Sequence, residues 1–79
     1  MDLPMLDFLK EKNTHTGSEG NFRYKLKPDG EEIKVWAYQT YCLEYCQEHG
    51  LMLGEETFPL DARGLEAAAA WLAEQQKKL

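Results

Sequence analysis

The chain has 79 residues, of which 43% are hydrophobic and 11% aromatic, so it can bury a core and is not a disordered segment. Its formal net charge of −5 argues against sequence-independent nucleic-acid binding and against docking on an anionic membrane, because both need many lysine and arginine contacts. We expect one α+β domain over residues 1–79. The two cysteines, the acidic N-terminus and the lack of a long apolar run indicate a cytoplasmic protein without a membrane segment.

Residues 3–12 have the pattern of a short amphipathic helix. Asp2 is a suitable N-cap, and Pro4 is tolerated in a first turn. The apolar residues, at spacings that form one broad face, are Leu3, Met5, Leu6, Phe8 and Leu9. Residues 13–20 contain no apolar side chain and therefore predict an exposed loop.

A β-hairpin over residues 21–27 and 32–38 is the strongest local prediction. Apolar and polar residues alternate on both sides of the Pro-Asp-Gly sequence at 28–30, which is typical of a tight turn. Both apolar sets must share one face, and a slip of one residue would invert one strand. The expected cross-strand pairs are Leu26–Ile33, Tyr24–Val35 and Phe22–Ala37.

Two interpretations of residues 39–49 remain open. A helix, which we favour, fits the spacing of three and four residues between Tyr41, Cys42, Tyr45, Cys46 and His49. Thr40 would then cap the helix and Gly50 would end it. Alternatively, the second hairpin strand continues through Tyr45, because tyrosine is common in strands.

The C-terminal third predicts a buried turn at 51–54, a short strand at 57–60 and a helix. Pro59 places the strand at a sheet edge, and Asp61 caps the helix. The apolar stripe of the helix consists of Leu65, Ala68, Ala69, Leu72 and Leu79, with Trp71 at its border. The whole chain therefore predicts a small antiparallel three-stranded sheet, a central β-hairpin plus a short edge strand, packed by the N- and C-terminal helices on one face.

Cys42, Cys46 and His49 form one candidate metal-binding set. On a helix these residues point the same way, and thiolate and imidazole are zinc ligands, with His15 or a carboxylate as a possible fourth. Their spacing is unlike that of zinc fingers, and a cysteine on an apolar helix stripe is usually a small core residue. We expect no bound metal or other cofactor, and keep a small metal-binding regulator as an alternative function.

Catalysis is not expected. Cys46 and His49 lie one helical turn apart, but the sequence supplies neither an oxyanion hole nor a group that would orient the histidine. No glycine-rich phosphate loop is present. We therefore predict a protein that is not an enzyme.

The polar face of the hairpin is the candidate binding surface. It carries Arg23, Lys25, Lys27, Lys34, Trp36 and Tyr38. Tryptophan, tyrosine and arginine are common anchors of protein interfaces, and the same side chains can stack on bases and contact phosphates. Ordinary cross-strand pairs, with Arg23 stacked on Trp36 and Lys27 beside Glu32, would also account for them.

Because the whole chain is acidic, a protein partner is favoured over nucleic acid. The residues predicted to bind it are Arg23, Lys25, Lys34, Trp36 and Tyr38. A single-stranded nucleic-acid binder that uses the same face is the alternative, and the oligomeric state stays open.

Overall fold

The computed structural model describes residues 3–39 and 42–79, which form three helices and four strands. In chain order the elements are α1 (Leu6–Lys10), β1 (His15–Glu19), β2 (Phe22–Asp29), β3 (Glu32–Gln39), α2 (Leu43–His49), β4 (Met52–Pro59) and α3 (Ala62–Gln76). The strands form one antiparallel sheet in the order β1-β2-β3-β4. The predicted α+β class is confirmed, but the predicted number of three strands is wrong.

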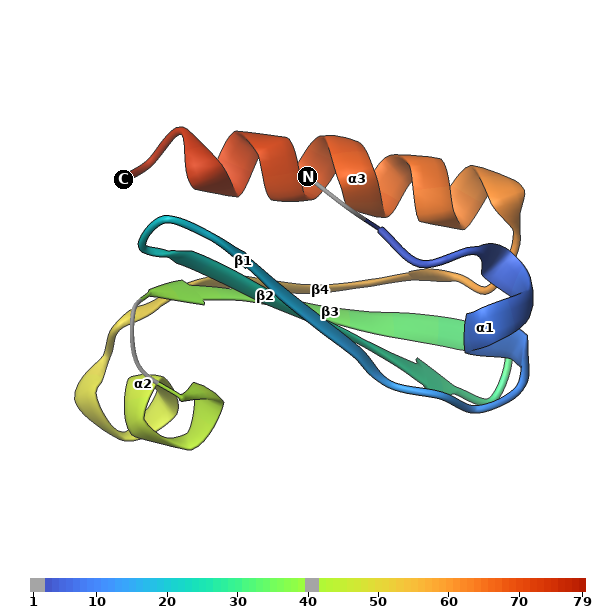
Figure 1. Cartoon of the computed structure of the whole chain (residues 1–79), viewed down its shortest axis with the longest axis horizontal. Helices are drawn as coiled ribbons and strands as arrows, with labels where there is room; N and C mark the ends of the chain where they lie inside the picture. The colour runs from blue at the N-terminus through green and yellow to red at the C-terminus, as the bar shows by residue number, and fades with distance from the viewer. Residues whose placement is uncertain (1–2, 40–41) are drawn as a thin grey trace.

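The helices lie on both sides of the sheet (Figure 1). The long helix α3 runs along one face, and α1 packs against the same buried cluster through Leu9. The short helix α2 lies on the opposite side, at the far end of the sheet from α1. In the described part of the chain, no helix is long and apolar enough to cross a membrane.

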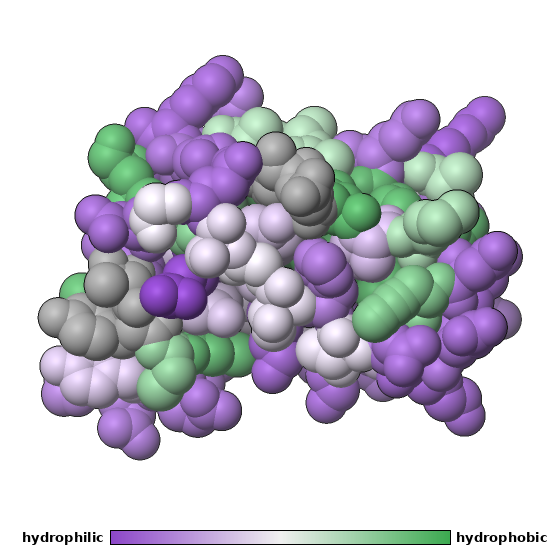
Figure 2. Space-filling model, viewed as in Figure 1, coloured by the Kyte–Doolittle hydropathy of each residue, from purple (hydrophilic) through white to green (hydrophobic). Residues whose placement is uncertain are grey.

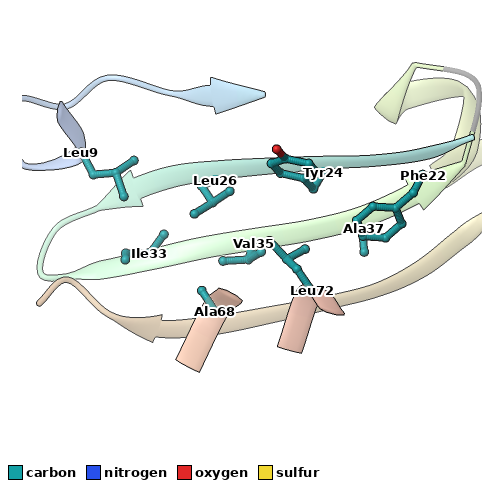
Figure 3. Close-up of a cluster of buried hydrophobic side chains, with 9 residues drawn as sticks. All are labelled: Leu9, Phe22, Tyr24, Leu26, Ile33, Val35, Ala37, Ala68 and Leu72. Carbon is teal, nitrogen blue, oxygen red and sulfur yellow. The ribbon is translucent and has the colours of Figure 1, made fainter. Parts of the chain in front are cut away.

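The core lies between the sheet and α3 (Figure 3). Alternate residues of β2 and β3 point into it, because successive side chains of a strand face opposite sides. The buried cluster consists of Leu9, Phe22, Tyr24, Leu26, Ile33, Val35, Ala37, Ala68 and Leu72. Complete burial of each large aliphatic or aromatic member contributes about 1.5–3 kcal/mol to folding.

The predicted hairpin register is wrong by two residues. Pro28 and Asp29 belong to β2, and the connecting loop is Gly30-Glu31, where Gly30 has the positive φ of 64° that the first position of a type II′ turn requires. Leu26 consequently lies opposite Val35. A shift of two residues preserves the alternation of faces, so the predicted buried set is retained.

Strand β1 replaces the exposed loop that was expected over residues 13–20. It pairs with β2 through a second two-residue loop, Gly20-Asn21, in which Gly20 has a φ of 59°. The strand needs no apolar side chain at its centre, because the ring of Tyr24 covers Gly17 and would collide with a side chain there.

For residues 39–49, the structure contains the favoured helix rather than a continued strand. Strand β3 ends at Gln39, and α2 ends at Gly50, which adopts the left-handed conformation with φ 69°. The predicted cap, Thr40, and Tyr41 lie outside the described residues.

The C-terminal strand is longer than predicted, and the final helix begins as predicted. Strand β4 starts at Met52, so the turn expected at 51–54 is wrong, and Pro59 does lie on an edge strand. Asp61 caps α3 by accepting a hydrogen bond from the Gly64 N–H at 2.7 Å. Leu79 follows the helix and is 53% exposed, so it is not part of the packed stripe.

Candidate functional site

The sheet face opposite α3, called here the open face, carries the predicted binding residues. Those from the hairpin are Arg23, Lys25, Lys27, Lys34, Trp36 and Tyr38. The neighbouring strands add Thr16 and Ser18 from β1, and Glu55 and Thr57 from β4. Cross-strand neighbours share a face, so these side chains form one continuous surface.

Trp36 lies near the middle of this face and is half-buried. The correct register places Lys25 directly opposite it, and the Lys25 ammonium lies 5.7 Å from the centre of a Trp36 ring, within reach of a cation–π interaction. The expected stacking of Arg23 on Trp36 is wrong, because Arg23 lies opposite Tyr38. On the other flank, Glu55 of β4 is the cross-strand neighbour of Trp36.

Lys27 and Lys34 face each other near the hairpin turn, so the expected pairing of Lys27 with Glu32 is wrong. The Lys34 ammonium lies 3.9 Å from a carboxylate oxygen of Asp29. Both of these side chains are substantially exposed, and an ion pair of this kind contributes at most about 1 kcal/mol. The repulsion between Lys27 and Lys34 is therefore offset only weakly by this ion pair.

Tyr38 differs from the expectation of an exposed side chain, because only 6% of its surface is accessible. It lies on the open face beside the N-terminal end of α2, where the two elements border one hollow. Burial raises the pKa of the Tyr38 phenol, and the charge of Arg23 partly opposes this shift. The hydroxyl group therefore stays protonated well above neutral pH.

A hollow of about 620 Å³ separates α2 from the β1–β2 end of the open face. Its wall combines the Arg23 and Lys25 cations, the Thr16 and Ser18 hydroxyls and the Tyr38 side chain. Two cations beside several hydroxyl groups form an environment suited to a carboxylate or another small anion. The hollow was not predictable from the hairpin pattern, because it depends on β1, and residues 13–20 have the composition of a loop.

Carboxylates surround the cations of the open face. Glu44 of α2 borders the hollow, Glu55 lies beside Trp36, and Asp29 lies beside Lys34. The face is therefore a mixed surface with a basic centre rather than a uniformly basic one. The alternation of the hairpin strands did not reveal these acidic neighbours. Glu44 belongs to residues 39–49, for which helix and strand both remained open, and Glu55 precedes the strand that was predicted at 57–60.

The candidate metal ligands are not arranged around a common point. The Cys46 thiol is buried and lies 3.4 Å from the carbonyl oxygen of Gln39, whereas Cys42 is exposed at the start of α2. The His49 ring stacks on Tyr45 with 4.1 Å between their centres. Among the residues that the structure describes, no group of three or more His, Cys, Asp or Glu side chains is arranged to hold a metal ion.

The proposed fourth ligand, His15, belongs to β1 and packs between two aromatic rings. Its ring lies 6.3 Å from Phe8 and 6.0 Å from Tyr24, measured between centres. Tyr24 belongs to the buried cluster beneath α3, whereas α2 lies on the other side of the sheet. His15 and the α2 residues therefore belong to different sides of the molecule.

Comparison with known proteins gives no family assignment: no protein-family model, no characterised protein and no solved structure matches this chain. The open face must therefore be interpreted from its own geometry and charges. Its distinguishing features are a half-buried tryptophan, a cluster of four cations and the adjoining hollow.

Proposed function

We propose that this chain is a non-enzymatic interaction module that binds a protein partner through the open face. Trp36 is the central anchor, Lys25 and Lys34 flank it, and Arg23 together with Lys25 receives an acidic side chain of the partner in the hollow. Tyr38 contributes the floor of that hollow rather than an exposed contact. The observation that carries the proposal is the position of Trp36, half-buried on the sheet face that α3 leaves uncovered.

The energetics favour Trp36 over the lysines as the anchor. A half-buried tryptophan loses its remaining water contact when a partner covers it, and such residues often contribute about 2 kcal/mol or more to binding. Exposed lysines at the rim of an interface contribute less to affinity and more to the rate of association. Lys25 already lies against the indole, so one side of the anchor is ordered before binding.

The distribution of charge supports a protein partner over a nucleic acid. A phosphate backbone that crosses the four cations of the open face would also meet the surrounding carboxylates, among them Glu44 and Glu55. The formal net charge of −5 adds a long-range repulsion. A protein surface with an acidic residue beside apolar ones can match both kinds of charge.

The partner is to be isolated by affinity capture from the source cell and its affinity then measured with purified components. We expect Trp36→Ala to weaken binding about 30-fold, which corresponds to about 2 kcal/mol. Lys34→Glu should weaken it through charge reversal at the rim. Tyr45→Ala is the matched control, because Tyr45 is an exposed aromatic residue of α2 that is 40% accessible. Unchanged affinity in both open-face variants would contradict the proposal.

Salt dependence and nucleic-acid titration separate the two partner classes. Nucleic-acid binding falls steeply with salt, with a log–log slope of about 0.7–0.9 per phosphate contact, whereas a contact centred on tryptophan changes little. Single-stranded DNA and RNA are added to the labelled protein. Shifts confined to the amides around Arg23, Lys25 and Trp36, together with a steep salt slope, would favour the nucleic-acid alternative.

A further inference from the structure

Strand β1 is an edge strand whose protection against pairing with another strand is limited to its short length and the charge of Glu19. Edge strands present unpaired backbone groups, and proteins protect them with proline, lysine or other charges, with bulges, or by keeping the strand short. The other edge, β4, contains Pro59 and adjoins the irregularity between Ala37 and Tyr38. By contrast, β1 reads His-Thr-Gly-Ser-Glu, with no proline, no lysine and no register shift in its pairing with β2.

The middle of β1, Thr16-Gly17-Ser18, is only weakly polar. In the orientation of Figure 1, β1 crosses the front of the molecule. Figure 2 shows the same side, and a pale band, intermediate between hydrophilic and hydrophobic, crosses the middle of the molecule over this strand. Strongly hydrophilic residues lie mostly toward the periphery, and a few interrupt the pale band.

The hairpin loop determines which backbone groups of β1 point outward. Glu19 and Phe22 flank the two-residue loop, so they form the hydrogen-bonded pair that closes the turn. Hydrogen-bonded and non-hydrogen-bonded pairs alternate along an antiparallel ladder. The N–H and C=O groups of Thr16 and Ser18 therefore point away from β2, toward the outer edge.

The strand is complementary to itself in the antiparallel sense. If two copies align with Gly17 opposite Gly17, Thr16 of each copy faces Ser18 of the other, and their outward backbone groups form two hydrogen-bonded pairs. The same alignment places His15 opposite Glu19 on both sides of the centre. Each pair other than the central Gly17 pair therefore occurs twice, as a twofold interface requires.

We propose that two copies of this chain associate by antiparallel pairing of β1 with β1 about Gly17. The four-stranded sheets then form one continuous eight-stranded sheet, with both α3 helices on one face and both open faces on the other. The absence of a side chain at Gly17 suits the central pair, because non-hydrogen-bonded pairs bring the backbones within about 4.5 Å.

Existing contacts within each copy are compatible with this pairing. Glu19 already accepts a hydrogen bond from Gln76 at 3.0 Å, so the pairing of the two copies rests on the backbone groups of Thr16 and Ser18. The basic centres do not clash, because the two β2 strands lie three strand spacings apart, about 14 Å. This distance exceeds the Debye length of about 8 Å at physiological ionic strength.

The pairing is expected to be weak, because a strand of this length buries far less than the roughly 1,000 Å² of a stable interface. Sedimentation velocity over a series of protein concentrations is therefore the appropriate measurement. We expect the mean sedimentation coefficient of the wild-type chain to rise with concentration toward that of a dimer.

Thr16→Pro is the decisive variant. It removes an outward N–H that β2 does not use, and proline is tolerated at this position of an edge strand. We expect it to abolish the rise in sedimentation coefficient, while the matched Thr16→Ala, which retains the N–H, behaves like the wild type. If Thr16→Pro does not fold, Ser18→Pro tests the same edge.

Amide hydrogen exchange of the wild-type chain identifies the surface that pairs, and it needs no substitution. The amides of Thr16 and Ser18 should gain protection as the concentration rises, whereas those of Gly17 and Glu19 are protected at every concentration by β2. A monomer at all concentrations, or a dimer that persists in Thr16→Pro, would overturn the proposal. A strand supplied by another protein would appear as protection of the same two amides only in the presence of that protein.

Discussion

The two faces of the sheet arise from the same strands but have different physical roles. On the face beneath α3, six alternate side chains of the hairpin are at most 2% exposed: Phe22, Tyr24 and Leu26 of β2 and Ile33, Val35 and Ala37 of β3. On the open face, the intervening residues are long cations and Trp36, which keep contact with water. Because neighbouring residues point to opposite sides, the residues that stabilise the fold and those proposed to bind a partner occupy different positions of the same strand.

The largest expected effect is on the covered face. Leu26→Ala should lower the free energy of unfolding by about 2–5 kcal/mol, because Leu26 is completely buried and its truncation leaves a cavity. Lys25→Ala, at the adjacent position on the open face, should cost less than about 1 kcal/mol, the energy of its contact with Trp36. Urea unfolding of both variants measures the difference, and equal losses would contradict the separation of roles.

An intermediate effect is expected at the start of α3, the helix that covers the core. Asp61→Ala removes the acceptor of the Gly64 N–H and should cost about 1 kcal/mol, within the usual range for an N-cap. Asp61→Asn is the control, because asparagine caps helices about as well. Thermal unfolding followed by circular dichroism distinguishes the two, and partner binding through the open face should not change in either.

The division into two faces was predictable from the sequence, whereas the register was not. Alternation from Phe22 to Leu26 and from Ile33 to Ala37 determines which residues share a face, but it is unchanged by a shift of two residues. The turn sets the register, and the Pro-Asp-Gly sequence at 28–30 predicted a turn that begins two residues too early. The positive φ of Gly30, at the first position of the two-residue loop, is the feature that sets the register.

The two outer strands were missed or shortened because their stability comes from their neighbours. Strand β1 contains no alternating apolar residues, and its Gly17 is covered by the Tyr24 ring from β2. Strand β4 carries Gly54, which packs closely against the Trp71 and Gln75 side chains of α3. Contacts between distant residues replace the local hydrophobic pattern in these segments, so the sequence identified only the C-terminal part of β4 and none of β1.

The candidate binding surface was predictable in composition but not in shape. The cations and Trp36 follow from the alternation of the hairpin, whereas the burial of Tyr38 follows from the position of α2 on the open face. That position depends on how the chain leaves β3, which no local pattern specifies. The adjoining hollow also needs β1, so it could not be anticipated from the hairpin alone.

The smallest expected effect is a gain in stability on the open face. Lys27 and Lys34 are direct cross-strand neighbours, and like charges in this arrangement are destabilising. Lys27→Glu should therefore stabilise the fold by about 0.2–1 kcal/mol, toward the low end because Asp29 lies nearby on the same face. The measurement is urea unfolding at low salt, repeated at high salt, where screening should remove most of the gain.

The Lys27→Gln variant distinguishes the loss of repulsion between Lys27 and Lys34 from the attraction that a carboxylate at position 27 would add. Glutamine removes the charge of Lys27 without introducing a carboxylate. We expect this variant to gain part of the stability gained by Lys27→Glu, and both variants to weaken binding of the proposed protein partner. A gain in stability accompanied by a loss of binding would show that the open face retains its cations at a cost to the fold. If Lys27→Glu instead destabilises the chain, Lys27 has a structural role, and the assignment of stability to the covered face alone is wrong.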